Sequence, residues 1–224
     1  MVVTLYHGSE ARIERPVFGV GNPANDYGLG FYCTLDRDLA CEWAVAEYRS
    51  GFANRYELET DGLTILDLNA PEYCTLHWLA VLVENREFDM KYPQQRMAAE
   101  YLMQNFRVAY DKADVIVGYR ADDSYFSFAK DFLNNTLSYP QLQRAMKLGS
   151  LGNQFVLKSP RAFGRLAFRE AVAAKWDEWY PSKKERDDDA RTRYRQMRQS
   201  FDPKELTMVD ILREGLKHGD PKLS

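Results

Sequence analysis

The fold is decided near the start of the chain, by the stretch Leu5–Ser9, which reads LYHGS, and by the stretch Gly28–Thr34, which reads GLGFYCT. An apolar and β-branched run leads into His7, so we expect a strand that ends there and is broken by Gly8. The second stretch is expected to form another strand, which the chain enters through two glycines. We expect the rest of the domain to be arranged around these two strands.

The loop between these strands, residues 10–27, is rich in Pro, Gly and Asn and is long enough to shape the rim of a pocket. Arg12 and Asp26 could reach a ligand from this loop or lie on the surface as solvated charges, and the second explanation is favoured for Arg12. After the second strand, Asp36 can cap a helix from about Arg37 to Arg49. Apolar positions recur on one face of this helix, as in a helix that packs against a core.

A His at a strand end, followed by Gly, places one imidazole beside one approachable backbone amide. His7 and Gly8 therefore suit a ligand that carries a sugar hydroxyl and a carboxamide. Tyr32 and Trp43 offer aromatic rings on which such a ligand can stack. On these residues alone, ordinary packing is the favoured explanation, with a strand-end His bonded to the backbone and aromatic side chains in the core.

A resemblance changes this balance. The motifs around His7 and Tyr32, followed by Trp43, resemble the NAD-binding half of ADP-ribosyltransferases of the His-Tyr-Glu type, which include poly(ADP-ribose) polymerases and diphtheria-like toxins. The chain resembles more closely an uncharacterised bacterial domain family that is grouped with those enzymes. The similarity extends to Ala121–Asp123 and to Gly152–Lys158, and it leaves about the last fifty residues unexplained. The motifs are specific as an ordered set and not one by one.

The resemblance implies an α+β fold with a split β-sheet core of the ADP-ribosyltransferase type, surrounded by helices. Residues 1–170 would form this domain, and residues 171–224 a charged, helical C-terminal extension. Within the domain, the Asp61-Gly62 pair predicts a hairpin between strands at Arg55–Glu59 and Leu63–Leu68. Periodicity predicts helices at about residues 72–84, 93–107, 124–134, 140–148 and 160–168, and strands at 113–119 and 154–158.

The resemblance also assigns binding roles. The residues that would hold NAD are His7, Gly8, Ser9, Tyr32, Trp43 and Gln154. His7 would hydrogen-bond the adenosine-side ribose, and the Gly8 backbone would hold the carboxamide. Tyr32 and Trp43 would bracket the nicotinamide ring. Gln154 would hold a hydroxyl of the nicotinamide ribose, and His7, Tyr32 and Gln154 are the residues expected to act in catalysis.

Gln154 stands where the resembled enzymes have a glutamate. Gln keeps the hydrogen bond but loses the negative charge that favours a cationic transition state, at a cost of a few kcal/mol. Three explanations follow: an active enzyme in which a nucleophilic acceptor or Asp122 or Asp123 supplies the missing factor, an NAD binder without catalysis, or an inactivating change. The first is favoured. Asp122 and Asp123 are equally well explained as the cap of the helix that follows.

Composition sets further bounds. The chain has 224 residues, 45% hydrophobic and 28% charged residues and a net charge of −3, all ordinary for a globular protein that does not bind nucleic acid through its overall charge. Three Cys without metal-ligand spacing and three His predict no metal site. The absence of a signal peptide, an apolar span or a lipidation motif predicts a cytoplasmic protein with reduced thiols and no membrane partner.

The C-terminal part has its own character. A charge run at Pro181–Asp189 predicts a mobile linker. Four arginines then fall within eight residues: Arg191, Arg193, Arg195 and Arg198. They suit an acidic polymer, with RNA favoured and then protein or DNA as the acceptor, although a solvated helix face explains them somewhat better before any partner is known. A cap at Asp202 predicts a helix to about His218, whose apolar face could dock on the domain or on an antitoxin.

These expectations lead to one function with two alternatives. The favoured function is an NAD-dependent ADP-ribosyltransferase that acts as an intracellular bacterial toxin of a toxin–antitoxin or phage-defence system. A non-catalytic module that binds NAD or ADP-ribose is the first alternative, and an NAD glycohydrolase is the second. Release of nicotinamide separates the first alternative from the two enzymes.

Overall fold

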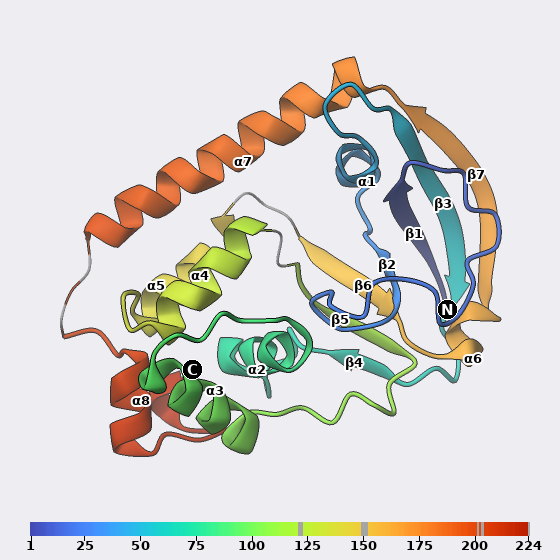
Figure 1. Ribbon diagram of the computed structural model, residues 1–224. Coiled ribbons are helices and arrows are strands. Elements are labelled where there is room, and N and C mark those ends of the chain that lie inside the picture. The colour runs from blue at the N-terminus through green and yellow to red at the C-terminus, as the bar shows by residue number, and fades with distance from the viewer. Residues whose placement is uncertain (121–122, 149–151, 201, 203, 224) are drawn as a thin grey trace.

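The computed structural model describes residues 1–120, 123–148, 152–200, 202 and 204–223. The chain forms two β-sheets with helices packed around them, which confirms the α+β class (Figure 1). The three-stranded sheet lies at the right of Figure 1, the four-stranded sheet lies in the middle, and most helices lie at the left. Within the described part of the chain, no helix is both long and apolar enough to cross a membrane.

The first sheet is antiparallel and has the order β1-β3-β7, formed by Val2–Ser9, Gly51–Glu59 and Leu166–Ala174. The strand end expected at His7 is wrong, because β1 continues through Gly8 to Ser9 and both residues pair with β3. The boundary expected after residue 170 falls inside β7, so the sheet takes residues up to Ala174. Helix α6 spans only Pro160–Phe163, and the helix expected to continue to residue 168 is wrong. The chain turns at Gly164 and then pairs with β3, which a local pattern of apolar residues did not indicate.

The second sheet has the order β2-β6-β5-β4, formed by Phe31–Cys33, Asn153–Leu157, Val115–Tyr119 and Ile65–Asp67. Its neighbouring strands are antiparallel, except that β4 and β5 are parallel. β5 is buried along most of its length, as its apolar and β-branched sequence predicts. Because β2 and β6 are neighbours here, the early aromatic strand and the late strand that carries Gln154 lie side by side.

The hairpin expected around Asp61-Gly62 is wrong, because β3 and β4 belong to different sheets. Gly62 has a φ of +74°, so a turn does form there. Beyond it, the Thr64 N–H donates to the Asp114 carboxylate at 2.8 Å. This contact leads the chain into a parallel pairing with β5, and the turn becomes a switch between the two sheets.

The main core lies between the second sheet and helices α2 (Thr75–Asn85), α3 (Pro93–Asn105), α4 (Asp123–Leu133), α5 (Tyr139–Ala145) and α8 (Met208–Glu214). α2 is buried over most of its length, because its sequence LHWLAVLV is apolar on nearly every side. These helices therefore cover one face of the second sheet. The first sheet and α7 lie on its other sides.

Helix α8 begins at Met208 and not near Asp202, so the expected start is wrong. Asp202 accepts a backbone hydrogen bond within a single turn, but the helix itself is capped by Thr207, whose N–H donates to the Asp210 carboxylate at 3.0 Å. It ends at Gly215, which has a φ of +68°. α8 belongs to the main core, so its apolar face docks on the domain.

Helix α1 spans Arg37–Ala44 and is capped by Asp36, whose carboxylate accepts from the N–H of Leu39 at 3.1 Å. The cap is as expected, although the helix ends earlier than Arg49. α1 crosses β1 so closely that a Cβ at position 8 would come within 2.1 Å of the Ala40 carbonyl oxygen. Gly8 is therefore required for packing.

Helix α7 is continuous over Trp176–Gln199, so the mobile linker expected at Pro181–Asp189 is wrong. Ion pairs four residues apart stabilise the charged stretch: Arg191 with Asp187 at 2.8 Å, and Arg193 with Asp189 at 2.9 Å. Such a run of charged residues is typical of a linker when it is considered alone. Here acidic and basic residues stand four positions apart, so they meet on the same side of the helix.

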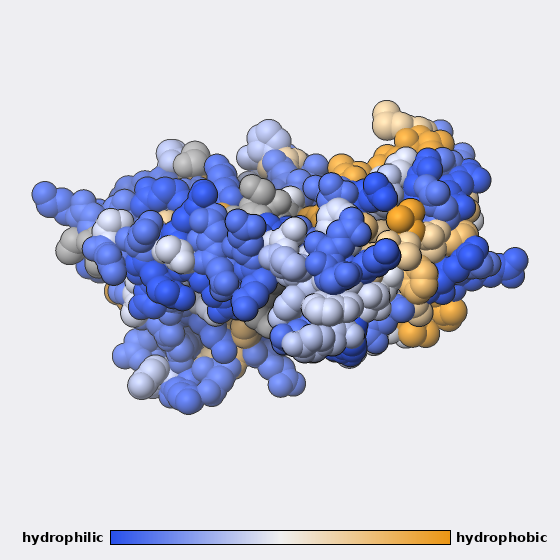
Figure 2. All heavy atoms as spheres, turned by 90° about the horizontal axis from the view of Figure 1, so that it is seen from above, coloured by the Kyte–Doolittle hydropathy of each residue, from blue (hydrophilic) through white to orange (hydrophobic). Residues whose placement is uncertain are grey.

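Both ends of α7 are anchored by apolar contacts. Trp176, Trp179 and Tyr180 pack on the small cluster between α1 and the first sheet. Tyr194 packs in the main core, with its ring 3.9 Å from that of Phe128. α7 therefore spans the molecule from the first sheet to the helical side, as Figure 1 shows. Seen from above, this side is mainly hydrophilic, and hydrophobic residues gather toward the end where the first sheet lies (Figure 2).

Candidate functional site

A cavity of about 920 Å³ lies between the two sheets, the loop of residues 13–26 and α7. This volume is in the range of small-molecule and cofactor sites, roughly 300–1,000 Å³. Its lining comes from strands, a loop and helices that are far apart in sequence. The sheets and α1 form one wall, which we call the strand wall, and residues 180–191 of α7 form the opposite wall, which we call the α7 wall.

The structure brings four of the predicted site residues to this cavity. His7 comes from β1, Tyr32 from β2, Trp43 from α1 and Gln154 from β6, and all four line the strand wall. The prediction that Gln154 faces the same cleft as His7 is therefore confirmed. Gly8 and Ser9 were expected in the site but do not belong to the described lining. Ser9 instead donates to the Ala11 carbonyl at 2.6 Å and accepts from Asn54 at 3.0 Å.

His7 is held in one tautomer by its neighbour. Its Nδ1 lies 2.7 Å from the Tyr32 carbonyl oxygen, and because a carbonyl can only accept, Nδ1 carries the proton. Burial lowers the pKa of His7 below its usual value, and the bond to the Tyr32 carbonyl offsets this only in part. The ring is therefore neutral at pH 7, and Nε2 can accept a hydrogen bond from a ligand hydroxyl.

The hydroxyl of Tyr32 is held by two hydrogen bonds to the backbone. Its hydroxyl donates to the Gly28 carbonyl at 2.5 Å and accepts from the Tyr27 N–H at 3.1 Å. Burial raises the pKa of the Tyr32 hydroxyl far above its usual value, so it cannot serve as a base near neutral pH. Lys158 holds the same loop by donating to the carbonyls of Tyr27 and Leu29 at 2.5 and 2.6 Å. What Tyr32 presents to the cavity is its ring.

Trp43 has a cation over its ring. The Arg120 guanidinium carbon lies 4.0 Å from the ring centre, a distance typical of a cation–π contact. The indole N–H is buried and has no hydrogen-bond partner among the residues that the structure describes. A flat ligand that stacks on this face of Trp43 would meet Arg120.

Gln154 lies against a buried carboxylate. Its Nε2 donates to Asp26 Oδ2 at 3.3 Å, and Arg86 Nη1 donates to Asp26 Oδ1 at 3.2 Å. Asp26 and Gln154 are each only 4% exposed, and all three residues line the cavity. Sequence reasoning placed Asp26 in a loop that could reach a ligand, but it did not connect it with Gln154. No local signal links them, because they are 128 positions apart.

Asp122, Asp123 and Arg12 are not among the described residues that line the cavity. Asp122 falls outside the residues that the structure describes. Asp123 begins α4, but its side chain also falls outside that description. Arg12 pairs with Glu14 at 2.9 Å and lies over the Phe168 ring at 5.4 Å, so it is a surface residue, as expected.

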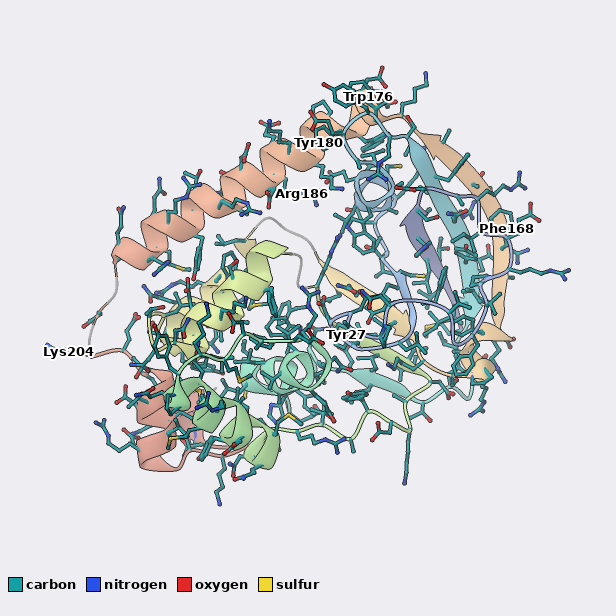
Figure 3. The ribbon with its side chains drawn as sticks, viewed as in Figure 1. Tyr27, Phe168, Trp176, Tyr180, Arg186 and Lys204 are labelled. Carbon is teal, nitrogen blue, oxygen red and sulfur yellow. The ribbon has the colours of Figure 1, made fainter. Side chains whose placement is uncertain are left out.

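The α7 wall was not anticipated from the sequence. Arg186 forms an ion pair with Glu42 of α1, and Lys183 donates to the Val45 carbonyl at 2.7 Å. Tyr180 and Arg186 lie on the side of α7 that faces α1 (Figure 3). These contacts place a row of charged side chains across the cavity from the strand wall.

The comparison with known families adds one finding. The family described as "Protein of unknown function (DUF3990)" matches residues 3–168, which is more than half of the chain. The chain belongs to this family. No curated protein and no solved structure matches it. Because the DUF3990 match ends inside β7, the strand wall lies within the matched segment, and α7 lies beyond it.

The four arginines clustered near the end of α7 do not form a single patch. They are Arg191, Arg193, Arg195 and Arg198, and all are exposed. Arg191 lines the cavity beside Asp187, whereas Arg198 pairs with Asp131 of α4 at 3.2 Å. Arg193 lies about 200° away from Arg191 around the helix axis at about 100° per residue, so the cluster divides between the cavity and the outside.

The charges around the cavity favour an anionic ligand. The lining includes seven basic residues: Arg15, Arg86, Arg120, Lys183, Lys184, Arg186 and Arg191. It includes three acidic residues, Asp26, Glu42 and Asp187, which leaves an excess of four positive charges in a chain of net charge −3. A cleft with an excess of one sign raises the local concentration of ligands of the opposite sign. Among the described residues, no group of three or more His, Cys, Asp or Glu could hold a metal ion.

Proposed function

We propose that this DUF3990 protein is an NAD-dependent ADP-ribosyltransferase built on a split β-sheet core of that type. The observation that carries the proposal is that His7, Tyr32, Trp43 and Gln154 line one cavity, although they lie on four different elements. These are the residues to which the resemblance gives NAD-binding roles. The size of the cavity and its excess of positive charge also suit a dinucleotide with its two phosphates.

The chemistry asks for positioning more than for proton transfer. Nicotinamide leaves as a neutral molecule from a cation, so the protein has to hold NAD bent and to stabilise a positive, oxocarbenium-like ribose. His7 would accept a hydrogen bond from the adenosine-side ribose at Nε2, because Nδ1 is already bound to the Tyr32 carbonyl. The rings of Tyr32 and Trp43 would hold the nicotinamide, with Arg120 moving from the face of Trp43 on which it now stacks.

The acceptor is proposed from the charges of α7. RNA is favoured, followed by protein or DNA, with Arg191, Arg193, Arg195 and Arg198 as contacts to the acceptor. In the cell we place the protein in the cytoplasm, as the toxin of a toxin–antitoxin or phage-defence system. An antitoxin would then be a further partner.

One observation favours a second candidate, a module that binds NAD or ADP-ribose without catalysis. Gln154 lacks the charge of the glutamate found in the resembled enzymes, and a cavity that keeps its hydrogen bonds can still bind. An NAD glycohydrolase, in which water is the acceptor, would use the same cavity. Asp122 or Asp123 would supply the missing charge in the first proposal, and exchange of either for Asn would then lower turnover with little effect on NAD affinity.

The test is to incubate the purified protein with NAD labelled in its adenylate part, together with separate RNA, DNA and protein pools. Nicotinamide release with label on one pool supports the transferase. Nicotinamide release with free ADP-ribose alone supports the glycohydrolase. NAD binding by calorimetry without nicotinamide release supports the binding module. If the protein neither binds NAD nor releases nicotinamide, the proposed function is refuted in all its forms.

A further inference from the structure

The structure assigns Asp26 a role that neither the motifs nor the family match gives it. We infer that the buried Asp26 carboxylate orients and polarises the Gln154 amide, so that the Asp26–Gln154 pair acts in place of the single glutamate of the resembled enzymes. The inference rests on the proposed function, because it concerns the same reaction. Asp26 is a positioning residue in this scheme and acts through Gln154.

The first step of the argument is the direction of the hydrogen bond. A carboxylate has no proton to donate, so the Gln154 atom that faces Asp26 has to be Nε2, at 3.3 Å from Oδ2. This choice leaves Oε1 as the acceptor of the amide. Within the described part of the chain, Oε1 has no hydrogen-bond partner, and Gln154 lines the cavity. Oε1 is therefore the atom that can accept from a ribose hydroxyl.

The second step concerns charge. A hydrogen bond to a carboxylate draws the N–H toward the anion and increases the negative charge on the carbonyl oxygen of the same amide. In a site from which water is largely excluded, such polarisation acts more strongly than in bulk water. Asp26 thus passes part of its charge to Oε1, where the oxocarbenium-like ribose would develop. Arg86 Nη1 lies 3.2 Å from the other carboxylate oxygen of Asp26, so the buried carboxylate also has a cationic partner.

The third step is that the pair is rigid. Gln154 pairs with Gly118 of β5, and a Cβ at position 118 would come within 2.3 Å of the Tyr27 hydroxyl. Tyr27 is fully buried, donates to the Tyr119 carbonyl at 2.6 Å and directly follows Asp26 in the chain. Tyr27 lies between the second sheet and α2 in Figure 3. The same insertion that requires Gly118 therefore sets the position of Asp26 against β6.

The decisive experiment relocates the charge. In Asp26→Asn the charge is lost, and we expect the rate of nicotinamide release to fall by about tenfold or more while the NAD dissociation constant changes by less than about threefold. In the double variant Asp26→Asn with Gln154→Glu, the carboxylate stands at position 154, and the amide introduced at position 26 can donate to it. We expect most of the lost rate to return. Gln154→Glu alone puts two carboxylates side by side and should bring no gain.

A matched control is available on α2. Glu84 pairs with Arg107 at 2.8 Å and does not belong to the described cavity lining, so Glu84→Gln breaks a carboxylate–arginine pair without touching the site. It should leave nicotinamide release unchanged. If Asp26 serves only as the structural partner of Arg86, the double variant will stay as slow as Asp26→Asn, and that result overturns the inference.

A second measurement does not need the reaction. The side-chain NH₂ resonances of Gln154, identified by their loss in Gln154→Ala, should shift in Asp26→Asn and stay in place in Glu84→Gln. Unshifted resonances would show that the pair does not form. If wild-type protein releases no nicotinamide although these resonances shift as expected, the proposed function fails and the catalytic role of the pair fails with it. If wild-type protein is active and Asp26→Asn is equally active, only the inference fails.

Discussion

The two walls of the cavity are built in different ways. The strand wall holds its residues through hydrogen bonds to the backbone, as in His7 with the Tyr32 carbonyl and Tyr32 with the Gly28 carbonyl. The α7 wall presents charged side chains from one helix that is anchored at its ends and, near the cavity, by the Arg186–Glu42 pair and by Lys183. The first wall is fixed by these backbone contacts, and the second supplies charge from a single helix.

This difference teaches where binding and selection of a partner should lie. Rigid, hydrogen-bonded side chains lose little freedom when a ligand binds, which suits the part of the site that would recognise NAD under the proposed function. Long charged side chains on a helix act over a greater distance and depend on salt, which suits contact with a macromolecule. The predictions below separate the two walls, beginning with the largest expected effect.

The largest effect is expected on the strand wall, at His7. His7→Ala removes the Nε2 acceptor and would leave the hydroxyl of a bound ribose without its partner, a loss of about 2–3 kcal/mol in binding. NAD affinity, or turnover where it is measured, should fall by about 30- to 150-fold. Calorimetric titration of NAD checks this. Unchanged titration in His7→Ala would remove His7 from the site, whereas the surface variant Arg12→Ala should bind as wild type does.

The next effect is expected where the two walls are joined. The Arg186 and Glu42 side chains are 22% and 12% exposed, so Glu42→Gln leaves a largely buried cation and should lower the free energy of unfolding by about 2 kcal/mol. Hydrogen exchange of the α7 amides should rise more than exchange in β5. As a control, Arg193→Gln removes an exposed ion pair and should cost about 0.5 kcal/mol or less. Equal protection of α7 in Glu42→Gln would mean that the apolar anchors alone hold the helix.

A smaller effect divides the four arginines. Arg193, Arg195 and Arg198 lie outside the described lining, so exchanging these three for Gln should lower modification of the acceptor and reduce its salt dependence without raising the KM for NAD. Arg191→Gln should affect both, because Arg191 lines the cavity. The same loss in acceptor modification and in nicotinamide release for the triple variant would show that these residues serve the helix. No loss in either would make them a solvated surface.

The smallest effect lies outside both walls, at His77 of α2. Its Nδ1 accepts from the Cys74 N–H at 3.0 Å, and burial lowers the pKa of His77 below the usual 6.5, with nearby His218 adding to this. The unfolded chain therefore binds the proton first as the pH falls. The stability from the neutral ring is present above about pH 6.5 and is lost as the pH falls through the lowered pKa of the folded state. His77→Gln keeps an acceptor that does not titrate, so its melting temperature should fall less than that of wild type between about pH 7.5 and pH 5.5.

Sequence reasoning reached the strand wall because its signals are local. A Gly-x-Gly entry into an aromatic strand and an Asp cap each depend on a few neighbouring residues, and β2 and the start of α1 lie where these signals predict, whereas β1 continues past His7 to Ser9. Strand β7 pairs with β3, more than a hundred positions earlier in the chain. The chain after Gly62 pairs with β5, about fifty positions later. Such distant pairing leaves little trace in a short window of sequence.

The α7 wall and the Asp26–Gln154 pair were missed for two further reasons. The charged run of α7 is helical because Tyr194 and the aromatic first turns are anchored in tertiary contacts, and its own ion pairs contribute only tenths of a kcal/mol each. Asp26 has the sequence neighbours of an ordinary loop residue. Its burial depends on the insertion of Tyr27 beside Gly118, which only the assembled sheet creates.

The placement of α7 also affects the order in which the protein is completed on the ribosome. The strands that the structure describes precede α7 in the chain, as do His7, Tyr32, Trp43 and Gln154, and α8, which fills the main core beside α3, follows it. Since a nascent chain becomes available for folding from its N-terminal side, the strand wall can assemble as an open trough before the charged wall has been synthesised. Under the proposed function, a translating ribosome would therefore carry a chain that cannot yet select its target.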